Sequence, residues 1–289
     1  MPAPLLIVDA PSVLFRAFYA LPDSIKGPDG TPVNALLGAA NLILAQVEQH
    51  EPRAVVLCFG PDAASYRVEL FPAYHAEREQ AFPEGLEAQW ADAGKFFAAF
   101  GWTIAVSENL EADDLMGSFA RREVEAGGSA LLLTGDRDMF QCAGTDVTVL
   151  YLRTGVRGAE LVTPKEVERR YGIPPELVPD FIALRGDPSD GIPGAKGVGA
   201  KTAAELLRRH GSLEAVLDGA FRETRPALRV ALTGAREQLL DFKRIATLQR
   251  ARIRRPRGKR TDWRGAAKAA RERGMNRLGE RLEEKAKAA

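Results

Sequence analysis

Two aspartates, Asp136 and Asp138, directly follow an apolar run in the stretch LLLTGDRDMF, residues 131–140. Carboxylates placed side by side repel each other, and moving one out of water is costly unless a partner compensates the charge. The pattern therefore has two explanations. Either both acids are solvated at a turn, or a cation lies between them.

The surrounding pattern predicts an α/β fold. Amphipathic segments that separate short apolar runs predict helices over Asn34–Gln49, Glu84–Phe100 and Glu111–Glu125. The apolar runs predict strands over Leu5–Val8, Ala54–Phe59, Thr103–Val106, Ser129–Thr134 and Val147–Leu150. Strands that are apolar on both faces and alternate with helices predict a parallel sheet covered by helices on both faces.

Acidic residues follow several of these strands. In open parallel sheets ligands bind beyond the carboxyl ends of the strands, so acids at strand ends gather at one rim. The six acids expected there are Asp9, Glu111, Asp113, Asp114, Asp136 and Asp138. Each cluster alone is also explained by helix capping or turn formation. Together they favour hard divalent cations such as Mg²⁺ between the carboxylates.

After Pro164 the pattern becomes wholly helical, which places a boundary between two units near residues 160–175. The expected helices are Lys165–Tyr171, Glu176–Leu184, Ala200–Arg209, Leu213–Leu217 and Ala235–Leu248. Asp187 and Asp190 bring the acid count to eight. The glycines that follow leave backbone N–H groups free to hold a phosphate before a helix, although turn chemistry also explains them. The candidate phosphate-binding residues are Gly194, Lys196, Gly197, Gly199, Lys201 and Thr202.

Charge is divided unevenly along the 289 residues. Residues 243–289 hold 17 Lys and Arg against 5 Asp and Glu, whereas residues 1–242 hold 23 against 34. The basic segment is either a solvated helical tail or a surface for a polyanion. No apolar run is long enough for a membrane span or a signal peptide, and two cysteines make no disulfide framework. We therefore expect a cytoplasmic protein.

Four motifs, in this order, carry a family resemblance: IVDAPSVLFRAFYALP, LEADDLMGSFA, TGDRDMFQ and LRGDPSDGIPGAKGVGAKTAAELL. The chain closely resembles the bacterial 5′-nucleases, which include the 5′→3′ exonuclease domain of DNA polymerase I and the flap endonucleases. The resemblance runs from about Leu5 to Leu248 and suggests a free-standing member. It implies a PIN-like or resolvase-like α/β nuclease domain over 1–165, with a helical arch near 71–95. A helix–three-turn–helix DNA-binding module over 166–250 and a basic helical tail over 251–289 would follow.

The resemblance also implies roles for single residues. Asp9, Glu111, Asp113, Asp114, Asp136, Asp138, Asp187 and Asp190 match the metal-site acids of the family, some of which bind through water. Two Mg²⁺ ions, with Mn²⁺ as a substitute, would activate water for attack on phosphorus. Arg16, His75 and Arg78 match positions that contact phosphates. The hairpin of this family commonly holds K⁺ against duplex DNA.

Implied partners are DNA with 5′ flaps, nicks or ends, RNA–DNA primers, and a functionally linked DNA polymerase. A monomeric, nucleoid-associated protein without a membrane partner is expected. The leading function is a Mg²⁺-dependent 5′→3′ exonuclease and flap endonuclease of replication and repair. The alternatives are a structure-specific DNA-binding protein with weakened catalysis and, less favoured by the hairpin, a ribonuclease.

Two departures from the family pattern affect catalysis. Gly60 stands where the family usually has an aspartate, with Asp62 two residues on, and His75 stands where the arch motif usually has lysine. Histidine is mostly neutral at pH 7 and supplies less positive charge to a phosphate, unless it is simply a solvated loop residue. We expect His75→Lys to speed cleavage at pH 8 and Gly60→Asp to lower the Mg²⁺ requirement.

Overall fold

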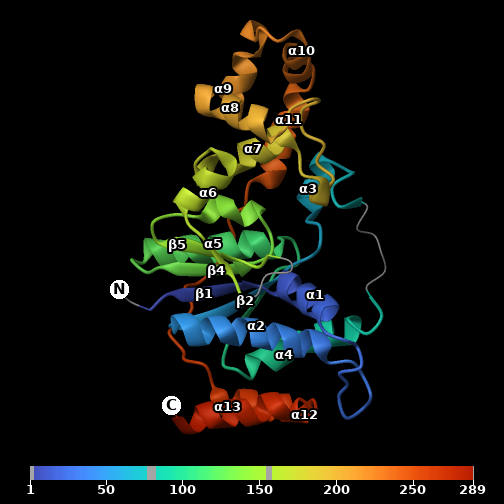
Figure 1. Cartoon of the computed structure of the whole chain (residues 1–289), viewed down its shortest axis with the longest axis vertical. Helices are drawn as coiled ribbons and strands as arrows, with labels where there is room; N and C mark the ends of the chain where they lie inside the picture. Colours follow the sequence, from blue (N-terminus) through green and yellow to red (C-terminus); the bar gives the residue numbers. More distant parts are fainter. Residues whose placement is uncertain (1–2, 77–82, 154–157, 289) are drawn as a thin grey trace.

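The computed structural model describes residues 3–76, 83–153 and 158–288, which are built around one six-stranded sheet (Figure 1). Its order is β3-β2-β1-β4-β5-β6, and every neighbouring pair is parallel except β5 with β6. The strands are β1 (Leu5–Asp9), β2 (Ala54–Phe59), β3 (Thr103–Val106), β4 (Ala130–Thr134), β5 (Val147–Tyr151) and β6 (Glu160–Val162). The five expected strands are confirmed, whereas β6 was not expected.

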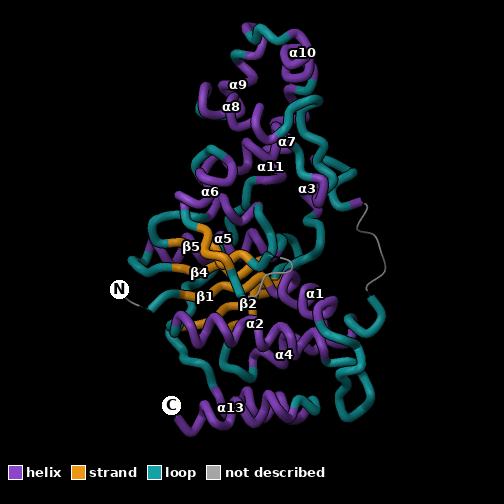
Figure 2. The backbone as a smooth tube through the Cα atoms, in the orientation of Figure 1, coloured by secondary structure: helices purple, strands orange, loops and turns teal. Residues whose placement is uncertain are grey.

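Helices cover both faces of the sheet, as expected (Figure 2). One face carries α1 (Ala10–Ala20), α2 (Asn34–His50), α4 (Glu87–Ala98), α12 (Trp263–Glu272) and α13 (Asn276–Ala288). The other face carries α5 (Ala112–Glu125). Strand β1 explains the two layers, because Leu5 and Ile7 enter one apolar core while Leu6 and Val8 enter the other.

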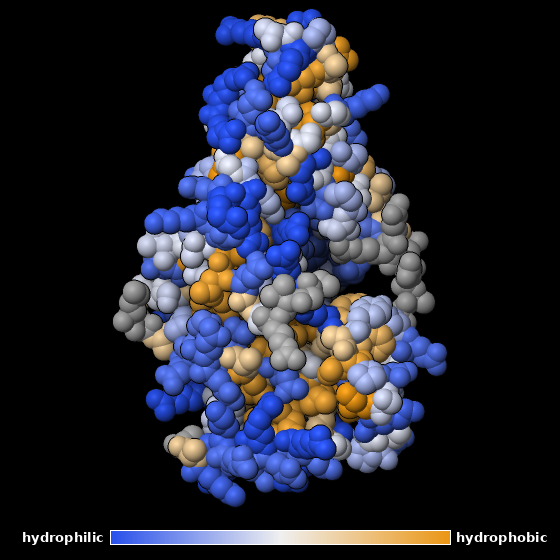
Figure 3. Space-filling model, viewed as in Figure 1, coloured by the Kyte–Doolittle hydropathy of each residue, from blue (hydrophilic) through white to orange (hydrophobic). Residues whose placement is uncertain are grey.

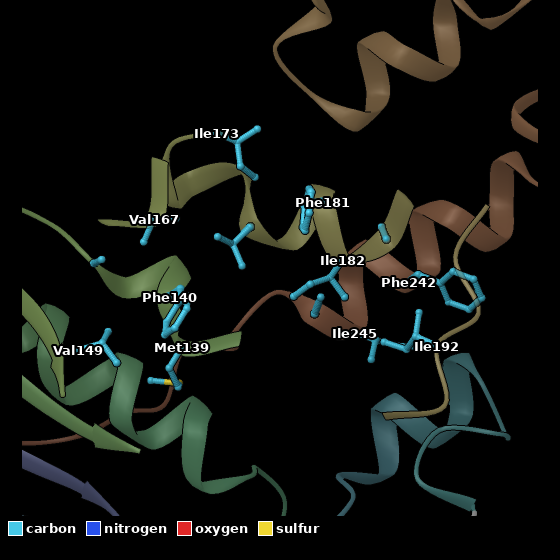
Figure 4. Packing of buried hydrophobic residues seen from close by; sticks show 14 of the residues in the cluster. Met139, Phe140, Val149, Val167, Ile173, Phe181, Ile182, Ile192, Phe242 and Ile245 are labelled. Atoms are coloured by element: carbon cyan, nitrogen blue, oxygen red, sulfur yellow. The ribbon is translucent and has the colours of Figure 1, made fainter. Parts of the chain in front are cut away.

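A helical unit continues from the α5 face (Figure 1). Its helices are α6 (Pro164–Tyr171), α7 (Val178–Arg185), α8 (Ala200–His210), α9 (Leu213–Asp218), α10 (Pro226–Gly234) and α11 (Arg236–Ala246). Met139 and Phe140, just beyond β4, belong to the same apolar cluster as Phe181 and Ile182 of α7 (Figure 4). This shared core fixes the helical unit relative to the strand ends.

An extended segment without regular secondary structure, residues 247–262, connects α11 to α12, and we call it the strap. Its backbone N–H groups bond to the α/β unit along its length. Gln249 N donates to Asp114 Oδ1 (2.7 Å), Ala251 N to Ser118 Oγ (2.8 Å) and Lys259 N to the Arg53 carbonyl (2.9 Å). The strap therefore follows α5 from its first turn toward the amino ends of the strands, where Arg53 precedes β2.

The C-terminal residues form a packed helical hairpin at the opposite end of the molecule from α8–α10 (Figure 1). Ala266, Ala270, Leu278 and Leu282 of α12 and α13 are buried in the core that also contains α2 and α4. Their outward surface is hydrophilic (Figure 3). The basic tail thus has one face in the α/β core and keeps its charges on the other.

Residues 87–95 of the expected arch belong to α4, whose Phe96 and Phe97 are fully buried, so this part covers the sheet. Residues 77–82, where Arg78 lies, are outside the described residues. No helix within the described parts of the chain is long and apolar enough to cross a membrane.

A buried carboxylate ties the strap to the sheet. Glu123 of α5 is fully buried and accepts N–H groups from both Arg53, which precedes β2, and Arg255 of the strap. Burial would raise the pKa of Glu123, but the hydrogen bonds from Arg255 and Arg53 outweigh it and lower the pKa to about 2. Three segments distant in sequence are thus joined at one side chain.

Gly60 marks a close approach between β2 and α5. A Cβ atom at this position would lie 2.4 Å from the Leu110 carbonyl oxygen and 2.7 Å from Ala112 N. The absence of a side chain therefore lets the first turn of α5 reach the end of β2. The expectation that Gly60→Asp lowers the Mg²⁺ requirement stays a prediction, and backbone atoms occupy the space that the new Cβ atom would need, so the substitution also requires α5 to shift.

We predict that Gly60→Ala and Gly60→Asp both lower the free energy of unfolding, by ~1–3 kcal/mol, because α5 must shift. Gly234→Ala is the matched control, since nothing lies within 4 Å of its added Cβ. Urea unfolding measures the three variants. A Gly60→Ala variant as stable as Gly234→Ala would contradict the close approach.

Breaking the Glu123 cluster should destabilise the fold. We predict that Glu123→Gln costs ~3–5 kcal/mol at pH 7, because two arginines lose their buried partner. A lowered pKa means that this contribution is present above the unfolded pKa, near 4.5, and is lost as pH falls toward about 2. The difference in unfolding free energy between wild type and variant should therefore shrink below pH 5.

The control is Glu125→Gln on the same helix, whose partner Arg122 is exposed and 3.4 Å away. That exposed pair should contribute less than ~1 kcal/mol. Equal effects of the two substitutions would mean that the buried cluster does not anchor the strap.

Candidate active site

The carboxyl ends of β1 and β4 place two acids at one rim of the sheet. Asp9, the last residue of β1, is buried and caps α1 by accepting Ser12 N at 3.0 Å. Its other oxygen accepts the Thr134 hydroxyl at 2.7 Å, and that hydroxyl in turn accepts Asp136 N at 2.9 Å. Thr134 therefore joins Asp9 of one strand to Asp136 after the next.

Asp136 and Asp138 form a tight turn between β4 and the 3-10 helix η2 (Asp138–Cys142). Asp138 N donates to Asp136 Oδ1 at 2.8 Å. Asp113 extends this group from the first turn of α5. Within the described residues, no lysine or arginine forms an ion pair with Asp9, Asp113, Asp136 or Asp138. We call these four side chains the rim acids.

The rim acids are held in an environment that disfavours their charged forms. Burial, with added repulsion from Asp190 and Asp9, raises the pKa of Asp136 to about 6. Burial followed by the charges of Asp9 and Asp136 raises the pKa of Asp113 well above its usual range. Burial followed by the charge of Asp136 does the same for Asp138. Burial also raises the pKa of Asp9.

Glu111 and Asp114 differ from the rim acids because a buried arginine neutralises them. Arg67 of α3 (Ser65–Leu70) lies 2.9 Å from both Glu111 Oε2 and Asp114 Oδ1, and its Nε donates to the Ile245 carbonyl at 2.9 Å. Burial would lower the pKa of Arg67, but the charges of Glu111 and Asp114 raise it. Asp114 also accepts Gln249 N of the strap, so both its oxygens are occupied. The geometry thus favours a structural role for Asp114 over the expected metal-binding role.

Glu111 caps α5 and also accepts hydrogen bonds from the segment 64–74. Its carboxylate accepts Ala64 N at 2.7 Å and the Tyr74 hydroxyl at 3.1 Å. Burial and the charge of Glu111 raise the pKa of Tyr74, which keeps this hydroxyl a donor. Glu111 therefore borders the rim acids while its oxygens hold the segment 64–74 in place.

The helical unit supplies two more acids near the rim. Asp187 caps η4 (Pro188–Asp190) by accepting Ser189 N at 2.9 Å, and Arg185 lies 3.1 Å from its other oxygen. The charges of Asp190 and Asp187 contribute to the raised pKa of both Asp136 and Asp138. The structure thus brings the acids of the second unit toward the rim acids, as the sequence suggested.

His75 lies in a buried link between the two units. Its Nδ1 is 2.7 Å from the Asp62 carbonyl oxygen, and its Nε2 is 3.1 Å from Asp190 Oδ1. The ring stacks on Tyr74 with centroids 4.0 Å apart, and the residue has a left-handed φ of 56°. Because the Asp62 carbonyl can only accept, Nδ1 carries a proton. The contact between Nε2 and Asp190 Oδ1 is a hydrogen bond that needs a proton on one of these two atoms. His75 therefore positions Asp190. The prediction that His75→Lys cleaves faster assumed a side chain directed at a substrate phosphate, whereas here both ring nitrogens contact Asp62 and Asp190.

Asp62 and Arg16 also have contacts that sequence reasoning did not anticipate. The Asp62 side chain is 67% exposed and its carboxylate lies 3.7 Å from His75 Nδ1. Arg16 of α1 donates to the Leu152 carbonyl at 3.0 Å and to the Arg153 carbonyl, at the end of β5. Arg16 thus ties α1 to the same rim, with the expected phosphate contact left as a prediction.

The glycine-rich hairpin presents an open surface before α8. Gly199 caps this helix without a side-chain hydrogen bond, and a Cβ atom at Gly197 or Gly199 would meet nothing within 4 Å. Lys196 and Lys201 are exposed on either side, and Thr202 follows in the first turn. Gly194 is different: its φ is 67° and its Cβ would lie 2.3 Å from Gly186 N, so it closes the hairpin. The arrangement offers N–H groups and ammonium groups to an anion.

The chemistry of the rim acids fits a hard divalent cation. They offer only oxygen ligands, Asp9 is buried and the other three are half-buried, and their raised pKa values show that nearby cations such as Arg67 and Arg185 do not offset burial and mutual repulsion. As the side chains stand, no group of three or more acidic, histidine or cysteine residues within 3–76, 83–153 and 158–288 is arranged to hold a metal ion. A bound ion would therefore have to draw these carboxylates together.

Several residues that organise the site were missed by sequence reasoning. Thr134 and Ser12 hydrogen-bond the rim, and Arg67 and Tyr74 hold Glu111. Thr134 at a strand end next to an acid was an available signal. Arg67 had none, since a single arginine in a short polar segment is normally exposed.

The chain is similar to known protein families and to individual relatives. The model of the 5′-3′ exonuclease N-terminal resolvase-like domain matches residues 4–172, and that of the 5′-3′ exonuclease C-terminal SAM fold matches residues 173–255. A 5′-3′ exonuclease of Mycobacterium tuberculosis is 38% identical over 239 residues, covering 76% of this chain and 74% of the relative. DNA polymerase I of Mycobacterium bovis is 38% identical over 215 residues, and the match covers 74% of this chain but 24% of that polymerase.

Solved structures share the fold at low sequence identity. A bacteriophage T5 flap endonuclease in complex with DNA and metal ions has a TM-score of 0.71 at 16% identity, covering 97% of this chain and 98% of that one. The catalytic core of Rad2 in complex with a DNA substrate has a TM-score of 0.63 at 12% identity, with 96% and 91% coverage. With two adjoining domain models matched over residues 4–255, the chain belongs to the 5′-3′ exonuclease family of nucleases.

Proposed function

We propose that this chain is a Mg²⁺-dependent 5′→3′ exonuclease and structure-specific flap endonuclease acting on DNA and on RNA primers. One observation carries the proposal. The rim acids are one buried carboxylate, Asp9, and three half-buried ones, none with an ion-pair partner among the described residues, and the chain also presents a hairpin that offers N–H groups to a phosphate. A cluster of partly desolvated acids without ion-pair partners is costly, so a cation and a substrate phosphate are the partners that we propose for it.

The proposed ligands of the cations are the rim acids Asp9, Asp113, Asp136 and Asp138, with Glu111, Asp187 and Asp190 contributing at the border or through water. Divalent ions bound there would supply Lewis-acid activation of water and neutralise charge on the phosphate. Thr134 keeps Asp9 and Asp136 in register, and His75 orients Asp190. The protein side chains thus define where the scissile phosphate is held.

The hairpin is proposed to hold the duplex part of the substrate. Gly197 and Gly199 leave space for a phosphate to approach the backbone, while Lys196 and Lys201 add positive charge. A K⁺ ion at this hairpin and a DNA polymerase as functional partner are further parts of the proposal. The relatives named DNA polymerase I support the second.

A structure-specific DNA-binding protein with weakened catalysis is the second candidate. The rim lacks a carboxylate at Gly60, and His75 is occupied by Asp62 and Asp190. Against it stands the clustering of the rim acids, since a protein that only binds DNA gains nothing from repelling charges next to a phosphate.

A cleavage assay separates these functions. The purified chain is incubated with a labelled 5′-flap DNA and with a matching single-stranded RNA, with and without Mg²⁺, and the products are sized. Mg²⁺-dependent cutting of the flap near its junction is expected. Binding without cutting would indicate the DNA-binding protein, and cutting of the RNA alone would indicate a ribonuclease.

We predict that Asp136→Asn lowers single-turnover flap cleavage by about a thousandfold or more, equivalent to ~4 kcal/mol, while flap binding stays within about threefold. The amide keeps the shape of the side chain but removes the charge that the cations require. Asp146→Asn, an exposed acid before β5, is the control and should leave the rate unchanged. An Asp136→Asn enzyme with near wild-type rate would remove the metal site from this rim.

We predict that Mg²⁺ stabilises the protein more at pH 8 than at pH 5. The raised pKa of Asp136, about 6, means that folding stability is lost as pH rises from the usual value, 3.8, through 6. Mg²⁺ binds the ionised acids and restores this stability, by ~2.7 kcal/mol at a hundredfold excess over Kd. At pH 5 the ion must first displace protons, so its effect is smaller.

Thermal unfolding with increasing Mg²⁺ at the two pH values measures the effect, and Asp136→Asn should reduce the shift at pH 8. The same Mg²⁺ shift at both pH values, or a full shift in the variant, would show that the rim acids are not where the ion binds.

A further inference from the structure

The strap carries an unusual concentration of positive charge. No acidic residue occurs between Asp241 and Asp262, and the strap has seven basic residues from Arg250 to Arg260. Six of them are exposed and form no ion pair within the described residues: Arg250, Arg252, Arg254, Arg257, Lys259 and Arg260. Only Arg255 has an acidic partner there, the buried Glu123. Like charges along one segment repel, so the free protein gains nothing from this arrangement.

The first part of the strap alternates as an edge strand does. Ala251 and Ile253 pack against the apolar core, whereas Arg250, Arg252 and Arg254 are exposed. In an extended backbone, residues two apart point the same way and lie about 7 Å from each other. The three arginines therefore form a row on the outward side, with a spacing close to that of successive phosphates in a nucleic-acid strand.

The row is held in place along its length. The strap is bonded at Gln249 N, Ala251 N and Lys259 N, and the Arg255–Glu123 cluster anchors its centre. A fixed row of charges loses little entropy when it binds a regular polyanion. This preorganisation separates the strap from an unstructured basic tail.

The position of the strap indicates which polyanion it meets. Gln249, its third residue, bonds to Asp114 in the first turn of α5, where the neighbouring Asp113 is a rim acid. From there the strap leads to α12, at the end of the molecule opposite α8–α10 (Figure 1). Residues 250–260 span at most ~36 Å, about one turn of duplex DNA. The hairpin before α8 and the strap are thus two cationic surfaces that lead toward opposite ends of the molecule.

We propose that the strap is a second phosphate-binding surface, which holds the duplex arm of a branched or nicked DNA that the hairpin does not hold. This rests on the proposed nuclease function, because it assumes that the substrate has two arms meeting at the rim. The 5′-3′ exonuclease domain model ends at residue 255, inside the strap. In this proposal, Arg250, Arg252 and Arg254 contact the phosphates of the second arm.

The test is equilibrium binding in EDTA, so that no cleavage is needed. Wild type and the triple variant Arg250→Gln, Arg252→Gln, Arg254→Gln are titrated with a nicked duplex that has two arms and with a single-arm duplex carrying a 5′ overhang. Fluorescence anisotropy is measured from about 50 to 200 mM salt. The matched control, Arg264→Gln, Arg277→Gln, Lys287→Gln, removes the same charge from exposed positions on α12 and α13.

For the two-arm DNA, the triple strap variant should lose about 2.7 units of log–log salt slope and at least about tenfold affinity at 0.1 M salt. Single-arm binding, and both DNAs with the control variant, should match wild type. An unchanged two-arm slope, an equal loss on the single-arm DNA, or an equal loss with the control would overturn the proposal.

The two proposals fail separately. A wild type that binds both DNAs with the expected slopes but cuts neither in Mg²⁺ would overturn the proposed nuclease function and leave the strap as a DNA surface. A wild type that cuts flaps, with a strap variant that binds two-arm DNA normally, would overturn only the strap.

Discussion

Repulsion among the closely placed rim acids is the constraint on which the rest of the structure depends. Asp9, Asp113, Asp136 and Asp138 come from two strand ends and one helix; burial raises the pKa of each, and the charges of neighbouring acids raise it further for Asp113, Asp136 and Asp138. Only a well-packed scaffold tolerates such a cluster. The doubly covered sheet supplies it, since its strands are apolar on both faces and its helices are fixed by two cores.

The first turn of α5 separates structural from chemical roles. Neighbouring residues in a helix point about 100° apart, so Asp113 and Asp114 meet different surroundings. Asp114 faces Arg67 and the strap, where its charge is matched, whereas Asp113 faces the other rim acids, where it is not. Arg67 also bonds to the Ile245 carbonyl. The position of Asp113 therefore depends on α3, α11 and the strap together.

The sequence predicted the parts of this fold that follow from periodicity. Apolar strands and acids at their carboxyl ends indicated the sheet and its rim. Strand β6 was not predicted because three residues give too short a pattern. Contacts between segments distant in sequence were not predicted either. Nothing local reveals that Gly60 touches the backbone of α5 or that His75 is enclosed by Asp62 and Asp190. The sequence left the basic tail open between a solvated helix and a polyanion-binding surface, and its packing into the core was not expected because its alanines are weak markers of burial.

The central claim is that divalent cations are the missing partners of the rim acids, and diffraction locates them most directly. Crystals soaked in Mn²⁺ would be measured at the manganese absorption edge, with Asp136→Asn crystals treated in the same way. The account predicts anomalous density among Asp9, Asp113, Asp136 and Asp138 in the wild type, and its loss or weakening in the variant. Density only elsewhere, or equal density in both crystals, would contradict it.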